Sequence, residues 1–474
     1  MTPFDVLDRV TGLRWTAPLV QPWKRVHTDT RSLQAGDFFV ALKGERFDAH
    51  DFLPQALQIQ LAGAMVSERA NEGGTTPLAV VPDTRAALSE WARAWRASLS
   101  MPLIAVTGSN GKTTVTQMLA SILRAAHGEN MHATQGNFNN DIGVPLTLLR
   151  LRETDARSVV ELGMNHPGEI AGLAAMAQPD VAVVNNAQRE HQEFMRDVES
   201  VARENASVFA HLRVNGAAVF PSDDEHTSLW RSLVAQGNAS VRVFTFSDRD
   251  AQATVHGHAQ WVDGGWQVQM KTPAGEAVLR LQIAGRHNVR NALAAAAAAL
   301  ASGVSLQHVC AGLQAFVPVQ GRSRLVQLPP SAQQSSRSLV DDTYNANPDS
   351  VLAAIAVLQE LPGPRWLALG DMGEVGEQGL TFHQEVLQSA LRAGFEHIDV
   401  TGDWMRQAVA HMPADSRLQW HDSVEAMLSV VPQRVSLVAS TLVKGSRFMR
   451  MERVVEAVMQ AAGSPITGGG AHAH

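Results

Sequence analysis

Short apolar runs separated by turn residues dominate the first hundred positions of the chain. Three of these runs, at 37–44, 62–67 and 78–83, have the length of strands. The segment that begins at Asp83 has an aspartate in the N-cap position and apolar residues at helical spacing, which predicts a helix ending near Leu99. Together these elements predict a small α/β domain at the N-terminus.

From residue 103 the pattern changes to continuous apolar runs that alternate with helical segments. The first run ends in Gly108, and an amphipathic helical pattern covers 112–127. Further apolar runs follow at 158–163, 181–186 and 217–220. Strands that are apolar on both faces and separated by helices are typical of a parallel sheet with helices on both sides. We therefore predict a parallel α/β domain in the middle of the chain.

Residues 240–283 differ, because apolar and polar residues alternate there between Gly-Gly and Pro-Ala-Gly turns. This pattern predicts an antiparallel excursion attached to the parallel domain, followed by helices over 288–301 and 305–316. After Pro318–Gly321 a second alternation of strands and helices begins, with apolar runs at 339–340, 366–369, 397–401 and 435–440. The second alternation predicts another α/β domain of Rossmann-like type.

The patterns together predict an α/β protein of three domains. Their predicted bounds are 1–100, 101–318 and 319–462, and a Gly-rich tail at 463–474 is expected to be flexible. A length of 474 residues agrees with this number of domains.

Composition narrows the class of protein. The net charge of 39 − 46 = −7 argues against nucleic-acid binding over the whole surface. No run approaches the ~20 apolar residues of a membrane span, and the N-terminus lacks the pattern of a signal peptide. The single cysteine, Cys310, excludes a disulfide framework and fits a reducing compartment. We expect a soluble cytoplasmic protein without membrane insertion.

The strongest local signal is a phosphate-binding loop between a buried strand and a helix. Glycines let successive backbone N–H groups and the helix N-terminus point at one anion. Lys112, one of five lysines against 34 arginines, would bridge phosphate oxygens, and the Thr113 hydroxyl would bind Mg²⁺. The spacing is G-x-x-G-K-T, because Val106 stands where the Walker pattern has glycine. The loop that we expect to bind ATP comprises Gly108, Ser109, Asn110, Gly111, Lys112, Thr113 and Thr114.

Other polar residues follow the neighbouring strands. Glu161 ends one strand and His191 follows the next, so both are candidates to hold a second cation beside the phosphates. No His or Cys spacing of a zinc site supports a transition metal. Two groups of polar side chains, which capping and turns do not fully explain, are candidate binding surfaces: Asn137, Asn139 and Asn140 in a loop, and His287, Asn288 and Asn291 at a helix start.

At this level of detail the chain resembles a known family. The blocks that carry the resemblance occur in order over most of the chain: TDTRSLQAGDFFVALKGERFDAHDF, TGSNGKTT, GNFNNDIGVPLTLL, ELGMNHPGEI, GRHNVRNALAA, DDTYNANPDS, GDMGEVG and LVKGSR. Together they are similar to the Mur ligases of bacterial cell-wall synthesis. Within that family, DDTYNANP resembles the member that adds a dipeptide, and the DNPR motif of the member that adds the third stem residue is absent.

The resemblance implies an ATP-dependent amide ligation in peptidoglycan precursor synthesis. ATP would phosphorylate the terminal carboxylate of UDP-N-acetylmuramoyl-tripeptide, and the amine of D-alanyl-D-alanine would attack the acyl phosphate, releasing phosphate besides ADP. The implied cofactors are ATP and Mg²⁺, the implied partners are these small molecules, and we expect a monomer.

The resemblance also implies roles for particular residues. Lys112, Glu161 and His191 would be catalytic, with Thr113, Glu161 and His191 as metal ligands. Asn288, Arg322 and Asp342 would contact ATP. The implied substrate-binding residues are Asp29, Thr30, Arg31 and Lys43 for the uridine nucleotide, Tyr344, Asn345 and Asn347 for the dipeptide, and Lys444 near the reacting groups.

One position departs from the family pattern. Family members usually have a lysine, modified to a carbamate, that bridges to the second metal, and here that position is Asn205. Glu204 is a candidate substitute, although a solvated helix residue is the alternative interpretation.

Two other classes of protein stay open at this point. One is a switch or motor in which ATP hydrolysis drives a change of shape. The other is an inactive scaffold that binds sugar nucleotides through its N-terminal block. The polar clusters at 137–140 and 341–347 argue for small substrates, and the intact Gly111-Lys112-Thr113 argues against a scaffold.

Overall fold

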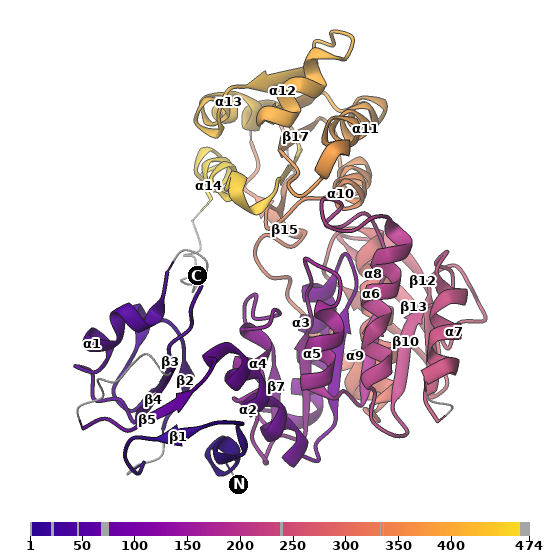
Figure 1. Cartoon of the computed structure of the whole chain (residues 1–474). Coiled ribbons are helices and arrows are strands. Elements are labelled where there is room, and N and C mark those ends of the chain that lie inside the picture. Colours follow the sequence, from indigo (N-terminus) through magenta and orange to yellow (C-terminus); the bar gives the residue numbers. More distant parts are fainter. Residues whose placement is uncertain are drawn as a thin grey trace.

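We analysed a computed structural model of the chain, which describes residues 2–19, 23–44, 47–67, 75–237, 240–331, 333–334 and 336–464. Its elements form three separate sheets with helices packed on them (Figure 1). The three-domain α/β prediction is confirmed, and the sheets use residues 14–81, 103–281 and 324–444. The domain bounds stay a prediction, and positions 465–474 of the predicted tail lie outside the described residues.

The N-terminal sheet has the order β1-β5-β4-β3-β2, with β1 antiparallel to β5 and the other pairs parallel. Asp83 caps the helix predicted after it, accepting bonds from the backbone N–H groups of Arg85 and Ala86. The elements are β1 (Arg14–Trp15), β2 (Val26–His27), β3 (Phe38–Val40), β4 (Gly63–Ser67), β5 (Leu78–Val81), α1 (Leu53–Ala56) and α2 (Thr84–Ser98).

The central sheet has the order β14-β13-β12-β11-β10-β9-β6-β8-β7. The pairs from β7 to β12 are parallel, and β12–β13 and β13–β14 are antiparallel. The antiparallel excursion therefore begins later than predicted, because β11 still pairs in parallel with both neighbours. The strands are β6 (Leu103–Thr107), β7 (Met131–Ala133), β8 (Arg157–Glu161), β9 (Val181–Val184), β10 (Ala217–Pro221), β11 (Arg242–Ser247), β12 (Val255–Val262), β13 (Gly265–Thr272) and β14 (Gly275–Leu281).

Alternate residues of the central strands belong to two apolar cores, one on each face of the sheet. Leu103 and Ala105 of β6 belong to the cluster on one face, and Ile104 and Val106 to the cluster on the other. The first core uses α4 (Gly143–Leu148), α5 (Glu169–Ala177), α6 (Val198–Ala206) and α7 (Thr227–Gly237), and the second uses α3 (Lys112–His127), α8 (Arg286–Ala301) and α9 (Leu306–Ala315).

The helix α2 belongs to the N-terminal domain but packs on the central one. Its buried residues share the first core with α4 and α5. Trp95 donates to the carbonyl of Leu151 at 3.1 Å, and the buried Arg96 donates to the carbonyl of Ala177 at 2.9 Å. The N-terminal domain is thus joined to the central domain through a common apolar core.

The C-terminal sheet has the order β15-β16-β20-β17-β18-β19, with only β15 antiparallel. The apolar run at 435–440 is not the last strand as predicted, because 435–437 end a helix and the strand begins at Ser440. The elements are β15 (Arg324–Leu328), β16 (Arg337–Asp342), β17 (Arg365–Gly370), β18 (His397–Thr401), β19 (Leu418–His421), β20 (Ser440–Lys444), α10 (Pro348–Glu360), α11 (Gly379–Arg392), α12 (Asp403–Ala410), α13 (Val424–Leu437) and α14 (Glu452–Ala461).

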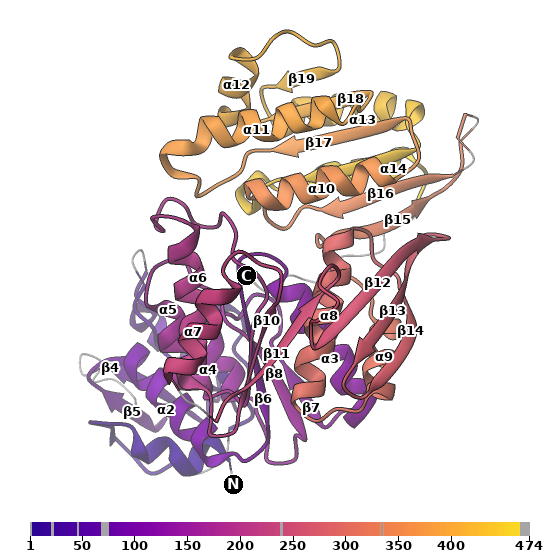
Figure 2. The same cartoon turned by 90° about the vertical axis from the view of Figure 1, so that its right-hand side faces the viewer.

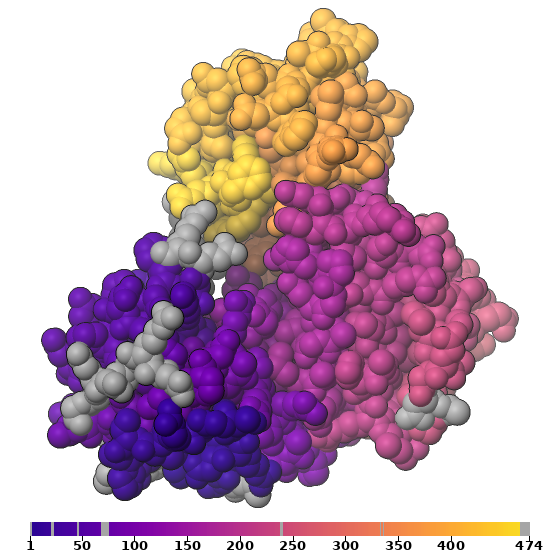
Figure 3. All heavy atoms as spheres, viewed as in Figure 1, coloured from indigo at the N-terminus to yellow at the C-terminus, as the bar shows by residue number. Residues whose placement is uncertain are grey.

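The C-terminal domain lies against the central domain (Figures 2 and 3). The segments that follow the carboxyl ends of β6, β8 and β9 face it there, because they line a cavity together with C-terminal residues. A cavity of about 1790 Å³ is lined by residues from both of these domains. In the part of the chain that the structure describes, no helix is both long and apolar enough to cross a membrane.

Candidate functional site

The phosphate loop joins β6 to α3, and two of its glycines are required by the backbone. Gly108 has φ +125° and Gly111 has φ +84°, both in the left-handed region. A Cβ atom on Gly111 would lie 2.5 Å from the side-chain oxygen of Asn291, and one on Gly108 would lie 2.9 Å from the backbone nitrogen of Asn185. The loop is therefore closed tightly against neighbouring asparagines, and Gly108 itself shapes the turn without lining the cavity.

Asparagines hold the loop in this shape. Asn185 donates to the backbone oxygen of Asn110 at 2.7 Å and to the side chain of Asn291 at 2.8 Å. Asn291 in turn donates to the side-chain oxygen of Asn288, whose own amide donates to the carbonyl of Ala284. The asparagines at the start of α8 thus support the loop from within the protein, and Asn288 also lines the cavity where a nucleotide contact is predicted.

The lysine of the loop is paired with a carboxylate that the sequence did not single out. Lys112 donates to the carbonyl oxygens of Gly108 (2.6 Å) and Ser109 (3.0 Å) and to Oε1 of Glu190 (2.7 Å). Glu190 directly precedes His191 in the segment after β9. That neighbourhood is the only signal that could have drawn attention to it, since an isolated glutamate in a loop is usually solvated.

Asn205 also holds the phosphate loop. Its Oδ1 accepts bonds from the Thr107 hydroxyl (2.6 Å) and the Gly108 N–H (2.9 Å), and its Nδ2 donates to the carbonyl of Val201 (3.1 Å). Glu204, the candidate substitute for the missing lysine, neither binds the phosphate loop nor is simply solvated. Its two oxygens accept from the N–H groups of Gly168 and Ile170 at the start of α5, because those groups have no partner within the helix.

Replacing Asn205 with alanine is expected to destabilise the fold by about 1–3 kcal/mol and to weaken ATP binding several-fold, because the substitution leaves the buried groups of Thr107 and Gly108 without a partner. Urea unfolding and titration with ATP measure the two effects. Glu199→Ala, at an exposed position of the same helix, serves as control and should change stability by less than about 0.5 kcal/mol. Unchanged ATP affinity in Asn205→Ala would show that the loop keeps its shape without this anchor.

Two of the three residues predicted to hold a metal, Thr113 and Glu161, are in contact beside the loop. Oε1 of Glu161 accepts from the Thr113 hydroxyl at 3.2 Å and from Asn139 at 2.8 Å. Its Oε2 is buried and has no hydrogen-bond partner among the residues that the structure describes, and the same holds for Oε2 of Glu190. Among the described residues, no three His, Cys, Asp or Glu side chains converge on one point. Mg²⁺ is usually held by one or two carboxylates together with phosphates and water, so the Glu161 carboxylate next to the Thr113 hydroxyl is a candidate to bind it.

His191 lies between two carboxylates. Its Nδ1 is 2.5 Å from Oε2 of Glu374 in the C-terminal domain, and its Nε2 is 3.5 Å from Oε1 of Glu190. Burial alone would lower the pKa of His191, but these carboxylates raise the pKa to about 9. The ring is therefore cationic at neutral pH, and it must lose a proton before it can bind a metal.

The C-terminal domain presents its own polar residues to the same cavity. Asp342 at the end of β16 is 2.6 Å from Nζ of the buried Lys444, which also donates to the carbonyl of Asn345 at 2.8 Å. The guanidinium of Arg322 stacks on the ring of Tyr344 at 3.7 Å. Burial would raise the pKa of Asp342, but the charge of Lys444 lowers the pKa overall. The residues predicted to contact ATP from this domain are thus already held as pairs.

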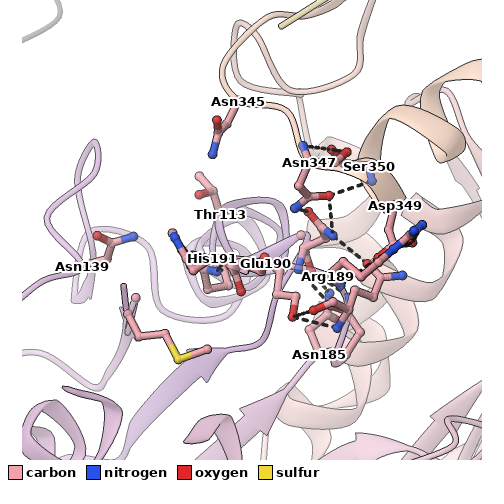
Figure 4. A pocket seen from close by; sticks show the side chains of 18 of the residues that line it. Thr113, Asn139, Asn185, Arg189, Glu190, His191, Asn345, Asn347, Asp349 and Ser350 are labelled. Atoms are coloured by element: carbon pink, nitrogen blue, oxygen red, sulfur yellow. Dashed lines mark hydrogen bonds and ion pairs between the residues drawn. The ribbon is translucent and has the colours of Figure 1, made fainter. Parts of the chain in front are cut away.

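Direct contacts join the two domains across the cavity (Figure 4). Asn347 caps α10 and also donates to the side chain of Asn110 in the phosphate loop at 2.9 Å. Arg189 of the central domain pairs with Asp349 at 2.7 Å and with Glu385 at 2.6 Å. These contacts place residues predicted for the dipeptide next to residues predicted for ATP.

The structure brings most of the predicted site residues together around one cavity. Those that line it are Ser109, Asn110, Gly111, Lys112, Thr113, Thr114, Asn137, Asn139, Asn140, Glu161, His191, Asn288, Arg322, Asp342, Tyr344, Asn345, Asn347 and Lys444. The residues predicted for the uridine nucleotide do not line it. Asp29 pairs with Arg31 at 2.7 Å and caps the turn that contains Thr30, and Lys43 bridges to Asp48 through the backbone.

Comparisons with known proteins agree with this arrangement. Residues 106–299 match the Mur ligase middle domain, and residues 328–447 match the domain described as Mur ligase, glutamate ligase domain. The chain is 38% identical over 441 residues to a UDP-N-acetylmuramoyl-tripeptide–D-alanyl-D-alanine ligase of Haemophilus influenzae, covering 91% of this chain and 93% of that protein. It is also 38% identical over 438 residues to the protein of the same name from Escherichia coli, with 92% and 93% covered.

Solved structures give the same result. A crystal structure of MurF from Acinetobacter baumannii superimposes with a TM-score of 0.87 at 33% identity, covering 97% of this chain and 98% of that one. With whole-length relatives at this identity and matches in both the middle and the C-terminal domains, the chain belongs to the Mur ligase family.

Proposed function

We propose that the chain is an ATP-dependent ligase that joins D-alanyl-D-alanine to the terminal carboxylate of UDP-N-acetylmuramoyl-tripeptide, with release of ADP and phosphate. The observation that carries the proposal is the shared cavity, in which Lys112 and Thr113 of the central domain face Asn345 and Lys444 of the C-terminal domain. The names and near-complete coverage of the relatives support the same reaction. The enzyme would act as a cytoplasmic monomer in peptidoglycan precursor synthesis.

The chemistry requires two anions to meet. A carboxylate oxygen of the tripeptide attacks the γ-phosphorus, and the bond to the ADP oxygen breaks. The dipeptide amine then attacks the carbonyl carbon of the acyl phosphate, loses a proton, and expels phosphate as the amide forms. Lys112 and the backbone N–H groups of the phosphate loop would hold the phosphate charge during both steps.

The residues present fit a magnesium site. Thr113, Glu161 and, once deprotonated, His191 would hold Mg²⁺, and the unpartnered oxygen of Glu161 is the atom that favours this assignment. When bound, Mg²⁺ would supply positive charge that offsets the repulsion between carboxylate and phosphate. Asn139 also donates to Oε1 of Glu161 and so helps to hold the carboxylate in place.

A phosphate-release assay with the full-length protein tests the proposal. Phosphate should appear only when ATP, UDP-N-acetylmuramoyl-tripeptide and D-alanyl-D-alanine are all present, and mass spectrometry should detect the UDP-linked pentapeptide. Release with ATP alone would favour a switch or motor. Binding of the UDP-linked substrate without any ATP turnover would favour a scaffold.

A further inference from the structure

The N-terminal domain reaches the cavity at one place. Among its described residues, only Arg85 and Ser89 line the cavity, and both lie on α2, four positions apart and therefore on one face of the helix. In the proposed reaction the acceptor is one continuous molecule, with its uridine nucleotide on the N-terminal domain outside the cavity and its reacting carboxylate beside Lys112. The peptide stem between these two ends therefore has to pass Arg85.

The guanidinium of Arg85 is held at one edge and open at the other. Its Nε donates to Oδ2 of Asp141 at 2.5 Å. Within the described part of the chain, neither the terminal nitrogens of Arg85 nor Oδ1 of Asp141 has a hydrogen-bond partner. The two side chains are 53% and 47% exposed, and a pair this exposed contributes little to stability. The pair thus leaves a fork of N–H donors and one carboxylate oxygen available to a ligand.

The pair of Arg85 and Asp141 lies a short way from the place where the acceptor would react. Asp141 follows Asn139 by two residues, which span at most about 7 Å. The amide of Asn139 donates to Glu161 at 2.8 Å, on the side of the cavity away from Asn347 (Figure 4). A stem residue whose carboxylate reacts beside Glu161 can therefore extend its side chain to Arg85.

Three carboxylates lie near the Arg85 guanidinium, those of Asp83, Asp141 and Glu169. Asp83 and Glu169 accept bonds from backbone N–H groups at the start of α2 and just before α5. A ligand with only a carboxylate would meet an excess of negative charge here, and a ligand with only an ammonium would leave the donors of Arg85 without a partner. A group that carries both charges, as a free amino acid does, satisfies Arg85 and Asp141 together.

We propose that Arg85 and Asp141 form the binding site for the far end of the third stem residue, in which the guanidinium binds a carboxylate and Asp141 binds an ammonium. The pair then selects a diaminopimelyl residue, whose side chain ends in both charges, over a lysyl residue, whose side chain ends in an ammonium alone. Arg85 is thus a specificity-determining residue for the acceptor. The inference rests on the proposed function.

Calorimetric titration of the full-length protein without ATP tests the inference, with two UDP-N-acetylmuramoyl-tripeptides that end in diaminopimelate or in lysine. The native protein should bind the diaminopimelate form about 10-fold more tightly. Arg85→Ala should bind the two forms equally, and Arg85→Lys should keep part of the preference, since lysine has the charge without the planar fork. Asp141→Asn should weaken the binding of both forms, because both carry the ammonium.

Arg93→Ala is the matched control, because it removes an exposed arginine from the same helix outside the cavity, and it should bind both forms as the native protein does. Equal affinity of the native protein for the two forms would overturn the inference. So would an equal loss of both forms in Arg85→Ala and in Asp141→Asn, which would show that the pair only joins the two domains. Thermal melting confirms that each variant is folded.

Failure of the proposed function would be seen in a different measurement. Absence of phosphate release with both acceptors would overturn the proposed ligase, whereas the preference between the two acceptors is measured without turnover. With an active native protein, steady-state kinetics of Arg85→Ala should show a raised KM for the diaminopimelate acceptor and a much smaller change in kcat, since Arg85 does not touch the reacting atoms. A loss confined to kcat would overturn the inference.

Discussion

Replacing Lys112 with alanine is expected to reduce kcat by about 10³-fold, because the substitution removes the one side-chain cation of the loop that would follow the phosphate charge through the transition state. The affinity for the UDP-linked substrate should stay within about two-fold, since Asp29, Arg31 and Lys43 lie away from the cavity of the phosphate loop. Steady-state kinetics and calorimetric titration of the UDP-linked substrate measure the two quantities separately.

Lys271→Ala is the control for this prediction, because Lys271 is an exposed residue on β13 outside the cavity. It should leave both quantities unchanged. Lys112→Arg should not restore the rate, since the planar guanidinium cannot occupy the position of a compact ammonium between two carbonyl oxygens. If Lys112→Ala lost affinity for the UDP-linked substrate to the same extent as it lost rate, the acceptor would bind at the loop and our placement of it would be wrong.

Arg189→Ala is expected to raise the KM for the dipeptide by about 10- to 100-fold. Arg189 joins the central domain to Asp349 of α10 and Glu385 of α11, and losing a partly buried pair of this kind costs about 2 kcal/mol or more. Burial alone lowers the pKa of Arg189, but the two carboxylates raise the pKa overall, so the guanidinium of Arg189 stays charged. The dipeptide residues on the C-terminal domain would then be held less closely to the phosphate loop.

Small-angle X-ray scattering provides a structural measurement for Arg189→Ala, because weaker docking of the C-terminal domain increases the radius of gyration. Arg189→Lys should give an intermediate result, since lysine keeps the charge but cannot bind two carboxylates with a planar fork. Arg196→Ala is the control, as Arg196 is exposed and pairs only with its neighbour Asp197 among the described residues. An unchanged radius together with an unchanged KM would show that other contacts dock the domain.

The fold could be predicted from the sequence wherever the local pattern of apolar residues matches the way in which those residues pack. The run 103–106, for example, is apolar at every position, and the structure divides its residues between two cores by alternation. The prediction of a strand over 435–440 is wrong. Apolar residues that end a helix and apolar residues that begin a strand have the same local pattern, and only the elements that pack against them distinguish the two. The strand β11 lies in the segment predicted to be antiparallel but pairs in parallel with β10 and β12, because the local alternation of apolar and polar residues does not specify the direction of the neighbouring strands.

The phosphate loop of the site could be predicted from the sequence, but the contacts between residues far apart in the chain could not. Gly111, Lys112 and Thr113 are recognisable because a phosphate loop is continuous in sequence. Glu190 and Arg189 act on partners 78 and 160 residues away, and no local spacing encodes such contacts. Glu204 shows the converse case, since its place in the sequence suggested a ligand and the fold uses it to cap a helix.

The shared core at α2 has a consequence for how the protein melts. Trp91 and Trp95 belong to the same apolar cluster as Leu103 and Val144 of the central domain, so the first two domains cannot lose their cores independently. The C-terminal clusters use their own residues apart from Ala284 and Trp261, and the contacts described across the cavity are polar. A calorimeter should therefore record two heat-absorption peaks for three sheets, and a saturating nucleotide that bridges the cavity should bring the two peaks together.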